Sequence, residues 1–320
     1  MKRIWKEIGI AVWMGMVLPA LLLHLVVKEK DVTTETIPVS VQQEEEAPEL
    51  MIPVLTADET IAEMKLSDYL TGVVLAEMPA SFELEALKAQ AVVARTYTLR
   101  AHDGKSKHVD ATVCTDSNCC QGYRAPQEYL AAGGLDDHVK KVLGAVMDTH
   151  GYVVTYKGEL IEATYFSCSG GRTEDAVAVW GTDVPYLRSV DSPGEEGATY
   201  YSDKLYFTVA ELKDMLDLDS SAESEDLIGD ISYTDGGGVA EINIGGKRFQ
   251  GTELRKLLGL RSTAFTVTVE DGGMTFVTRG YGHRVGMSQY GADAMAVEGS
   301  TYQEILMHYY PGTTLEQRID

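Results

Sequence analysis

Residues 66–97 read LSDYLTGVVLAEMPASFELEALKAQAVVARTY, two helical patterns separated by a short break. Apolar side chains at helical spacing predict a helix over residues 66–77, and Pro79 prevents it from continuing. Ser81 is placed to cap a second helix, which the pattern predicts over residues 82–100. The many alanines of this second helix indicate that another element packs closely against it.

The rest of the chain alternates short strand patterns with helix patterns. Alternating runs on either side of Lys157-Gly158 predict a hairpin over residues 152–166. The acidic, Ser-rich stretch 219–235 is expected to be a surface insertion. Strand patterns cover residues 51–56, 265–269 and 275–278, and helix patterns cover 136–148, 211–218 and 302–309. Short connections between such mixed elements favour an α+β fold over a doubly wound one.

An apolar run, IGIAVWMGMVLPALLLHLVV, covers residues 8–27 and has the length that a bilayer core requires, about 20 residues. Residues 1–7 form the more basic flank, so we expect one membrane helix with a cytoplasmic N-terminus. A cleaved signal peptide is the alternative, but no small-x-small cleavage site follows the run. Residues 28–50 are expected to be an acidic, solvated linker. Residues 51–320 then form an ectodomain outside the cytoplasm.

The charge balance limits the partners of this chain. Its 49 acidic and 27 basic residues give a formal net charge of -22. Such a surface repels the phosphates of nucleic acids and anionic lipid headgroups, so neither is an expected partner. An anionic substrate would need a local basic patch to overcome this field.

Several common catalytic signatures are absent from the sequence. It contains no phosphate-binding GxxxxGKS/T, no HExxH and no GxSxG. Glu77 is a better candidate, because it ends an apolar helix just ahead of Pro79. Partial burial there would raise the pKa of its carboxyl and make it a usable general acid. The alternative is a solvated glutamate at a helix end.

The cysteines form a pattern of their own. His108, Cys114, Cys119 and Cys120 supply four ligands within one loop, a set adequate for a tetrahedral structural zinc. A disulfide between Cys114 and Cys120 is the alternative, since exported proteins usually oxidise their cysteines. Cys168 stands alone and is expected to be buried and inert.

Three blocks of sequence together resemble the stage II sporulation protein D family, whose wider group includes amidase-enhancer proteins. The first is the stretch 66–97 quoted above. The second is the predicted hairpin followed by FSCSGGRTEDAVAVWG, residues 166–181, and the third is GYGHRVGMSQYGADAMA, residues 280–296. The resemblance extends over roughly residues 51–312 and implies a two-lobed ectodomain with a substrate groove.

The resemblance implies a lytic transglycosylase that acts during engulfment in sporulation. It would cleave peptidoglycan glycan strands lacking stem peptides and leave 1,6-anhydro-muramic acid ends. Glu77, in the family's EMP motif, would be the sole acid/base catalyst, and catalysis would need no cofactor. A non-catalytic cell-wall binder that enhances an N-acetylmuramoyl amidase is the alternative.

The resemblance also implies roles for other residues and partners. Lys88 and Arg95 would bind the lactyl carboxylates of the glycan, whereas the pattern alone equally allows two solvated surface cations. Some family members carry zinc at a His/Cys loop of similar spacing. The expected partners are the glycan, a cell-wall amidase and a membrane scaffold protein of the engulfment machinery. The groove would be lined by His283, Ser288, Gln289 and Tyr290.

Overall fold

The computed structural model describes residues 49–219, 227–270 and 272–318, which belong to one compact unit, Pro48–Asp320. None of the helices in these ranges has both the length and the apolar character needed to cross a membrane. The membrane helix predicted over residues 8–27 and nearly all of the predicted linker lie outside the described residues.

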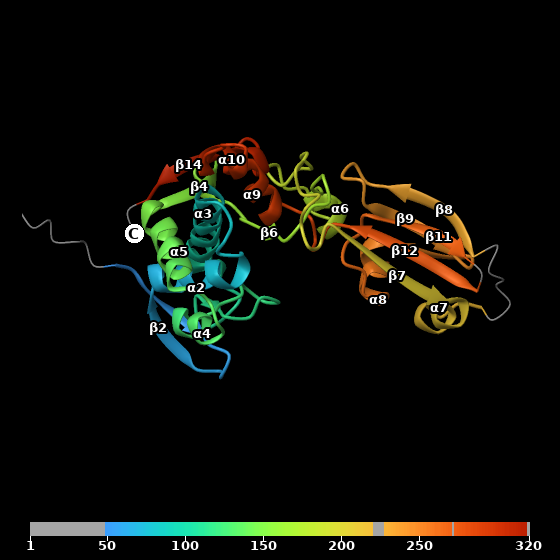
Figure 1. The fold of residues 1–320 in the computed structure, drawn as a ribbon, viewed down its shortest axis with the longest axis horizontal. Helices are drawn as coiled ribbons and strands as arrows, with labels where there is room; N and C mark the ends of the chain where they lie inside the picture. Colours follow the sequence, from blue (N-terminus) through green and yellow to red (C-terminus); the bar gives the residue numbers. More distant parts are fainter. Residues whose placement is uncertain (1–48, 220–226, 271, 319–320) are drawn as a thin grey trace, which may run out of the picture. The chain divides into compact units, whose positions relative to one another are not determined.

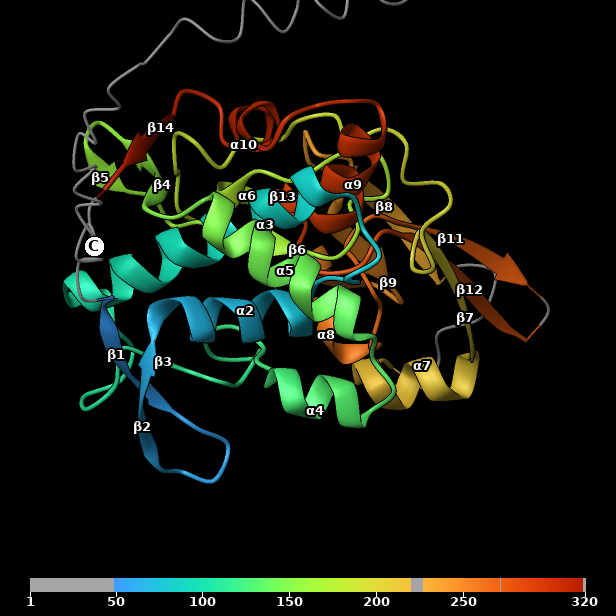
Figure 2. The same cartoon turned by 60° about the vertical axis from the view of Figure 1, so that its left-hand side comes forward.

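Helix α3 (Leu84–Arg100) is the centre of the larger hydrophobic core (Figure 1). It contacts α2 (Leu66–Glu77), α5 (Asp136–Asp148), α9 (Gln289–Val297) and α10 (Tyr302–Tyr309). Its alanines are fully or almost fully buried, so the predicted close approach of other elements is confirmed. Figure 2 shows α2 lying between α5 and α4 (Pro126–Ala131), and α2 contacts both helices.

The break between α2 and α3 differs from the prediction in one respect. Phe82 N–H donates to the Pro79 carbonyl at 3.0 Å, so residues 79–82 form a turn rather than the first turn of a helix. Ser81 is therefore not the cap. The N-cap is Glu83, whose backbone N–H donates to the Asp293 carboxylate at 2.7 Å. A contact distant in the sequence thus sets where α3 begins.

A small sheet precedes α2 and orients it. Strand β1 (Met51–Leu55) pairs antiparallel with β2 (Ile61–Lys65) and parallel with β3 (Val113–Cys114). The Glu49 carboxylate accepts a hydrogen bond from Ser67 N–H at 2.8 Å, which satisfies a free donor of the first turn of α2.

The predicted hairpin is confirmed in its first half. Strands β4 (Tyr152–Tyr156) and β5 (Glu159–Leu160) pair antiparallel, and β14 (Thr314–Gln317) pairs with β4. The second strand does not continue to Phe166 as predicted. Instead β6 (Tyr165–Phe166) pairs in parallel with β13 (Met287–Ser288), because the chain leaves the hairpin after Leu160. This pairing brings the second and third sequence blocks together.

A second hydrophobic core is built from residues 205–276. One sheet has the order β11-β12-β7 and another the order β10-β9-β8. Within the predicted surface insertion over 219–235, Ile228–Tyr233 forms a strand, β8, which has four exposed and no buried positions. A register irregularity after Ile228 breaks the alternation that would have revealed this strand.

The elements not yet named are β7 (Ser202–Thr208), β9 (Val239–Ile244), β10 (Lys247–Gln250), β11 (Phe265–Glu270), β12 (Gly273–Arg279), α6 (Ala176–Trp180), α7 (Val209–Leu216), α8 (Gly251–Leu257) and η1 (Ala101–Lys105). The predicted mixed α+β architecture is confirmed.

Candidate active site

Glu77 is the last residue of α2, and a loop that follows the cysteine cluster reaches its carboxylate. Gly122 N–H donates to Glu77 Oε1 at 2.5 Å. A Cβ atom at position 122 would lie only 2.9 Å from the same oxygen, so this approach depends on glycine. The hydrogen bond holds Oε1 in place.

The same loop is laid along α2 by contacts upstream of Glu77. Arg124 N–H donates to the Gly72 carbonyl at 3.0 Å. The Tyr123 ring stacks on Tyr69 with centroids 5.8 Å apart, and a Cβ at Gly72 would lie 2.1 Å from the Tyr123 ring. A helix position without a side chain therefore makes room for the loop that contacts Glu77.

Burial raises the pKa of the Glu77 carboxyl above 4.5. The Gly122 N–H, the Tyr165 hydroxyl and the Gln289 amide act in the opposite direction, but burial outweighs them. The Gln289 amide influences the carboxyl although its Nε2 makes no hydrogen bond of normal geometry within the described residues. The Tyr165 hydroxyl donates to Gln121 Oε1 at 3.5 Å. Glu77 is thus a partly desolvated carboxyl of the kind predicted, rather than a solvated helix end.

Two cavities meet at this carboxyl. The larger has a volume of 760 Å³, within the range of small-molecule sites, about 300–1,000 Å³. The smaller has a volume of 330 Å³. Both are lined by Glu77, Ser167 and Gln289. A chain-like ligand that occupied both cavities would therefore pass Glu77 between its ends.

His283 lines the larger cavity as a neutral imidazole. Its Nδ1 accepts a hydrogen bond from Val285 N–H at 3.1 Å, which leaves the proton on Nε2. Burial, and next the Arg255 cation, lower its pKa to about 4. Its ring packs against Trp180 and Phe166, with centroids 5.3 and 5.6 Å away.

The other predicted groove residues take different places. Gln289 lines both cavities, and Tyr290 lines the smaller one, where its ring meets Phe82 edge-on at 4.9 Å. Ser288 is fully buried and caps α9 by accepting a hydrogen bond from Gly291 N–H at 3.2 Å. It supports Gln289 and Tyr290 rather than lining either cavity.

The structure does not bring Lys88 and Arg95 to Glu77. Lys88 Nζ forms ion pairs with Glu85 at 3.0 Å and Asp148 at 3.2 Å. Arg95 is 2% exposed, and its guanidinium donates to backbone carbonyls of the α5 C-terminus, Val146 at 2.9 Å and Thr149 at 2.6 Å. Arg95 is therefore a structural arginine, neither a solvated cation nor a residue facing the cavities.

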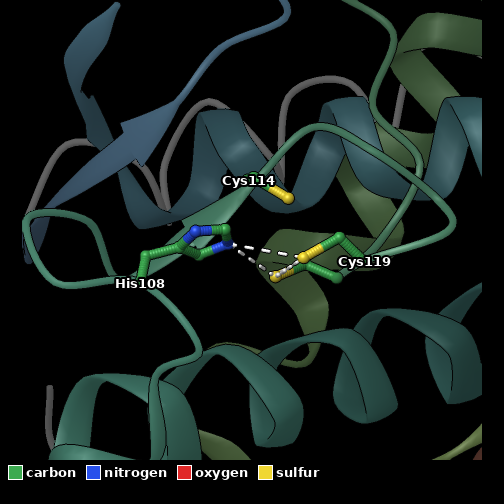
Figure 3. Close-up of side chains that lie close together, drawn as sticks. His108, Cys114 and Cys119 are labelled. Atoms are coloured by element: carbon green, nitrogen blue, oxygen red, sulfur yellow. Dashed lines mark hydrogen bonds between the residues drawn. The ribbon is translucent and has the colours of Figure 1, made fainter. Parts of the chain in front are cut away.

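The predicted metal ligands do converge. The ligand atoms of His108, Cys114, Cys119 and Cys120 all lie within 4.8 Å of one another. Figure 3 shows the His108 ring directed at the sulfur of Cys119. His108 Nε2 lies 3.6 Å from Cys119 Sγ and 3.4 Å from Cys120 Sγ. All four cysteines of the chain are free thiols in this structure, so the alternative disulfide is not formed. Three sulfurs and one imidazole fit a tetrahedral zinc.

Sequence reasoning missed several residues of the larger cavity, among them Gln121, Tyr165, Trp180 and Arg255. Tyr165 and Trp180 belong to or adjoin the second sequence block, so that block carried a signal for them. Arg255 comes from the second core and lies in no recognisable motif.

Comparison with known proteins places the chain in a family. A family model described as Stage II sporulation protein matches residues 56–156. The stage II sporulation protein D of Bacillus subtilis (strain 168) is 40% identical over 274 residues, which cover 83% of this chain and 79% of that protein. That of Bacillus amyloliquefaciens is 37% identical over 267 residues, covering 82% of this chain and 77% of that protein.

A third relative has a different name. An amidase enhancer of Bacillus subtilis (strain 168) is 32% identical over 301 residues, which cover 77% of this chain and 40% of that protein. The fold and the site together define a mixed α+β protein with two cavities that meet at a half-buried carboxyl. The chain belongs to the stage II sporulation protein D family.

Proposed function

We propose that this protein is a lytic transglycosylase that cleaves peptidoglycan glycan strands lacking stem peptides during engulfment in sporulation. The observation that supports this best is the position of Glu77, a carboxyl with a raised pKa between two cavities. A glycan strand bound across both cavities would present a glycosidic bond to this carboxyl.

The reaction needs one group that first donates and then accepts a proton. Protonated Glu77 gives its proton to the glycosidic oxygen as the bond from C1 breaks. The resulting carboxylate then takes the proton from the muramic acid 6-hydroxyl, whose oxygen bonds to C1. The products are a 1,6-anhydro end and a free 4-hydroxyl, and no water is consumed. A raised pKa favours the first step, and the same group is a stronger base in the second.

The surroundings of Glu77 suit a mechanism with one carboxylate. Glycoside hydrolases generally use two carboxyl groups that flank the bond. Among the described residues, Glu162 is the other acidic residue lining the larger cavity, and it pairs with Arg100 at 3.8 Å. Its side chain is 48% exposed, so it lacks the desolvation that activates Glu77.

Product analysis of a matched pair of variants tests the proposal. Denuded glycan is incubated with the protein, and mass spectrometry measures anhydro ends. Glu77→Gln keeps the shape but transfers no proton, so cleavage should fall at least ~100-fold. Glu162→Gln is the control and should retain most of the activity. Near-normal cleavage by Glu77→Gln would contradict the assignment.

A non-catalytic role as an amidase enhancer is the second candidate, and the relative with that name favours it. The two functions separate in one assay. A purified cell-wall amidase is mixed with the Glu77→Gln protein and intact peptidoglycan. Undiminished stimulation of the amidase, together with no anhydro product from the parent protein, would favour the enhancer.

We further propose a structural zinc held by His108, Cys114, Cys119 and Cys120. When bound, zinc would replace the thiol protons and tie the loop 108–120 into a closed unit. Nothing in the mechanism above requires it for proton transfer.

The proposed location is supported by the charge flanking residues 8–27, and the proposed partners are supported by the family resemblance. We propose that residues 8–27 anchor the protein in the membrane with the remainder on the cell-wall side, in a complex with a cell-wall amidase and a membrane scaffold protein.

A further inference from the structure

Arg255, on α8 of the second core, lines the same cavity as Glu77. Its Nε donates to the backbone carbonyls of Leu260 at 3.3 Å and Arg261 at 3.2 Å, which fixes the side chain. Within the described residues its two Nη atoms make no hydrogen bond and no ion pair. A half-buried guanidinium therefore lines the cavity with its terminal donors unused.

The charges around Arg255 do not neutralise it. Burial lowers its pKa, and its cation in turn lowers the pKa of His283, so the two side chains lie near each other. The other cation lining the cavity, Lys107, already donates to the Cys119 carbonyl. In a chain with a net charge of -22, a partly desolvated cation without a carboxylate partner is a site for an anion.

The rest of the cavity wall near Arg255 suits a sugar. Trp180 and Tyr281 line the cavity and are 44% and 42% exposed, so each offers exposed aromatic surface to the apolar face of a sugar ring. The Arg261 guanidinium lies over the Tyr281 ring at 5.5 Å and holds it in place. A ligand with both a sugar ring and an anionic group fits these neighbours together.

We propose that Arg255 binds the free lactyl carboxylate of a muramic acid residue, so that the cavity selects glycan from which the stem peptide has been removed. The assignment rests on the proposed action on glycan strands. In an intact strand the lactyl group is a neutral amide, and hydrolysis of that amide creates the carboxylate. The two Nη donors of a guanidinium match the two oxygens of a carboxylate, and a partly desolvated site strengthens this pairing.

Binding measurements on the full-length chain in mild detergent test this assignment without catalysis. The Glu77→Gln background prevents turnover, and calorimetry compares denuded glycan with the same glycan after its carboxylates are converted to methylamides. The Glu77→Gln protein, which retains Arg255, should bind the free acid about 10- to 100-fold more tightly than the methylamide. This ratio corresponds to the free energy of one charge-assisted hydrogen bond. Arg255→Gln should abolish the preference, because it weakens binding of the free acid more than binding of the methylamide glycan.

Two further variants make the test specific. Arg255→Lys keeps the charge but loses the paired donors, so an intermediate preference is expected. Arg248→Gln is the matched control, since Arg248 is on the same core, 68% exposed and paired with Glu241 at 3.6 Å. It should keep the full preference.

The outcomes separate this inference from the proposed function. The role of Arg255 is overturned if the protein that retains Arg255 binds both glycans equally. It is also overturned if Arg255→Gln keeps the full preference for the free acid, even if anhydro products are formed. Loss of the preference in Arg255→Gln supports that role, even if product analysis shows that the parent protein only binds glycan.

Discussion

The Glu77 carboxyl experiences opposing influences at close range. Gly122 N–H stabilises its charged form, while burial favours its neutral form and prevails. A carboxyl in this balance keeps its proton at a higher pH than a solvated glutamate does. That property links both the activity and the stability of the protein to pH.

The pH dependence of activity follows from the direction of this shift. The proposed cleavage starts from the protonated acid, so the rate should fall as the pH rises through the raised pKa of Glu77. A rate profile for denuded glycan should show this limb in the parent protein and lose it in the residual activity of Glu77→Gln. The same limb in both proteins would assign the titration to another group.

The pH dependence of stability has the same cause. The folded-state pKa of Glu77 lies above the ordinary value of 4.5, so the folded state loses stability as the pH rises from about 4.5 through the raised pKa. Glu77→Gln has no charge to bury. Its thermal midpoint relative to the parent should therefore be higher at pH 8 than at pH 5. A constant difference between the two proteins would show that burial does not control this carboxyl.

Gly122 offers a separate test of geometry. In Gly122→Ala the new Cβ would lie 2.9 Å from Glu77 Oε1, so the carboxylate or the loop must move. Misplacement of a reacting group by about 1 Å costs as much as ~100-fold in rate, and a loss of about 10-fold or more is expected in kcat. Gly144→Ala is the control, because that position in α5 meets nothing within 4 Å. It should keep activity and gain a little stability.

At the scale of elements, the site depends on the loop between η1 and α4. The loop carries the His/Cys cluster and, two residues later, Gly122. Cys114 also belongs to β3, so the cluster is joined to the sheet that precedes α2. The His/Cys cluster, the sheet and α2 therefore form one packed unit.

Metal removal should destabilise this unit. A structural zinc contributes its binding free energy to folding, so Cys114→Ser should lower both the zinc content and the thermal midpoint. The parent protein should carry about one zinc by elemental analysis. Cys168→Ser is the control, since a hydroxyl can still donate to Glu195 Oε2, which Cys168 Sγ approaches at 3.1 Å. A metal-free parent with the same midpoint would contradict the prediction.

The elements that the sequence predicted well are those with local causes. The helices over 66–77, 136–148 and 302–309 have strong apolar periods and clear ends, and they form as predicted. Strand β8 and the start of α3 depend on a bulge and on Asp293, neither of which is visible locally.

The predictability of the site residues also depends on whether their positions have local causes. Glu77 lies in the EMP motif and the four ligands lie within one loop, so both were predictable, whereas the contact of Gly122 with Glu77 was not. The family resemblance predicts substrate-binding cations on the neighbouring helix, at Lys88 and Arg95. Arg255 instead reaches the cavity through the tertiary fold, and no periodicity could indicate this.

At the scale of the whole molecule, the proposed topology is open to a direct test. The more basic flank of residues 8–27 predicts that residues 51–320 lie outside the cytoplasm. Protease added to intact cells, in which the outer face of the membrane is exposed, should digest this part of the chain. If this part is digested only after the membrane is opened, the predicted orientation is wrong.

A buried ion pair connects the segments of the larger core with the β8–β9 turn. Arg284 donates through Nη2 to the Gly236 carbonyl at 2.8 Å, and Glu174 accepts from the Thr234 hydroxyl at 2.6 Å. The two charges lie 3.7 Å apart, with side chains 3% and 1% exposed. Arg284 also adopts a left-handed backbone conformation with φ of 65°, which an arginine rarely does. The contacts of its side chain offset this strain.

Removing Arg284 should therefore cost far more stability than removing a surface arginine. Arg284→Met leaves the Glu174 charge buried without a partner, and such losses cost about 3–5 kcal/mol. Arg172→Met, which breaks the exposed pair with Asp191, should cost no more than about 1 kcal/mol. Urea denaturation at a constant m-value measures both changes.

The double variant Arg284→Met with Glu174→Gln decides whether the loss comes from the stranded charge. Glutamine can still accept a hydrogen bond from Thr234 but has no charge to bury, so the double variant should recover part of the stability lost by Arg284→Met. If the double variant is no more stable than Arg284→Met, the cost lies in the hydrogen bonds from Arg284 to the carbonyls of Ser169, Arg172 and Gly236. Arg284 would then act as a backbone clamp between the two cores, and the ion pair would be incidental to it.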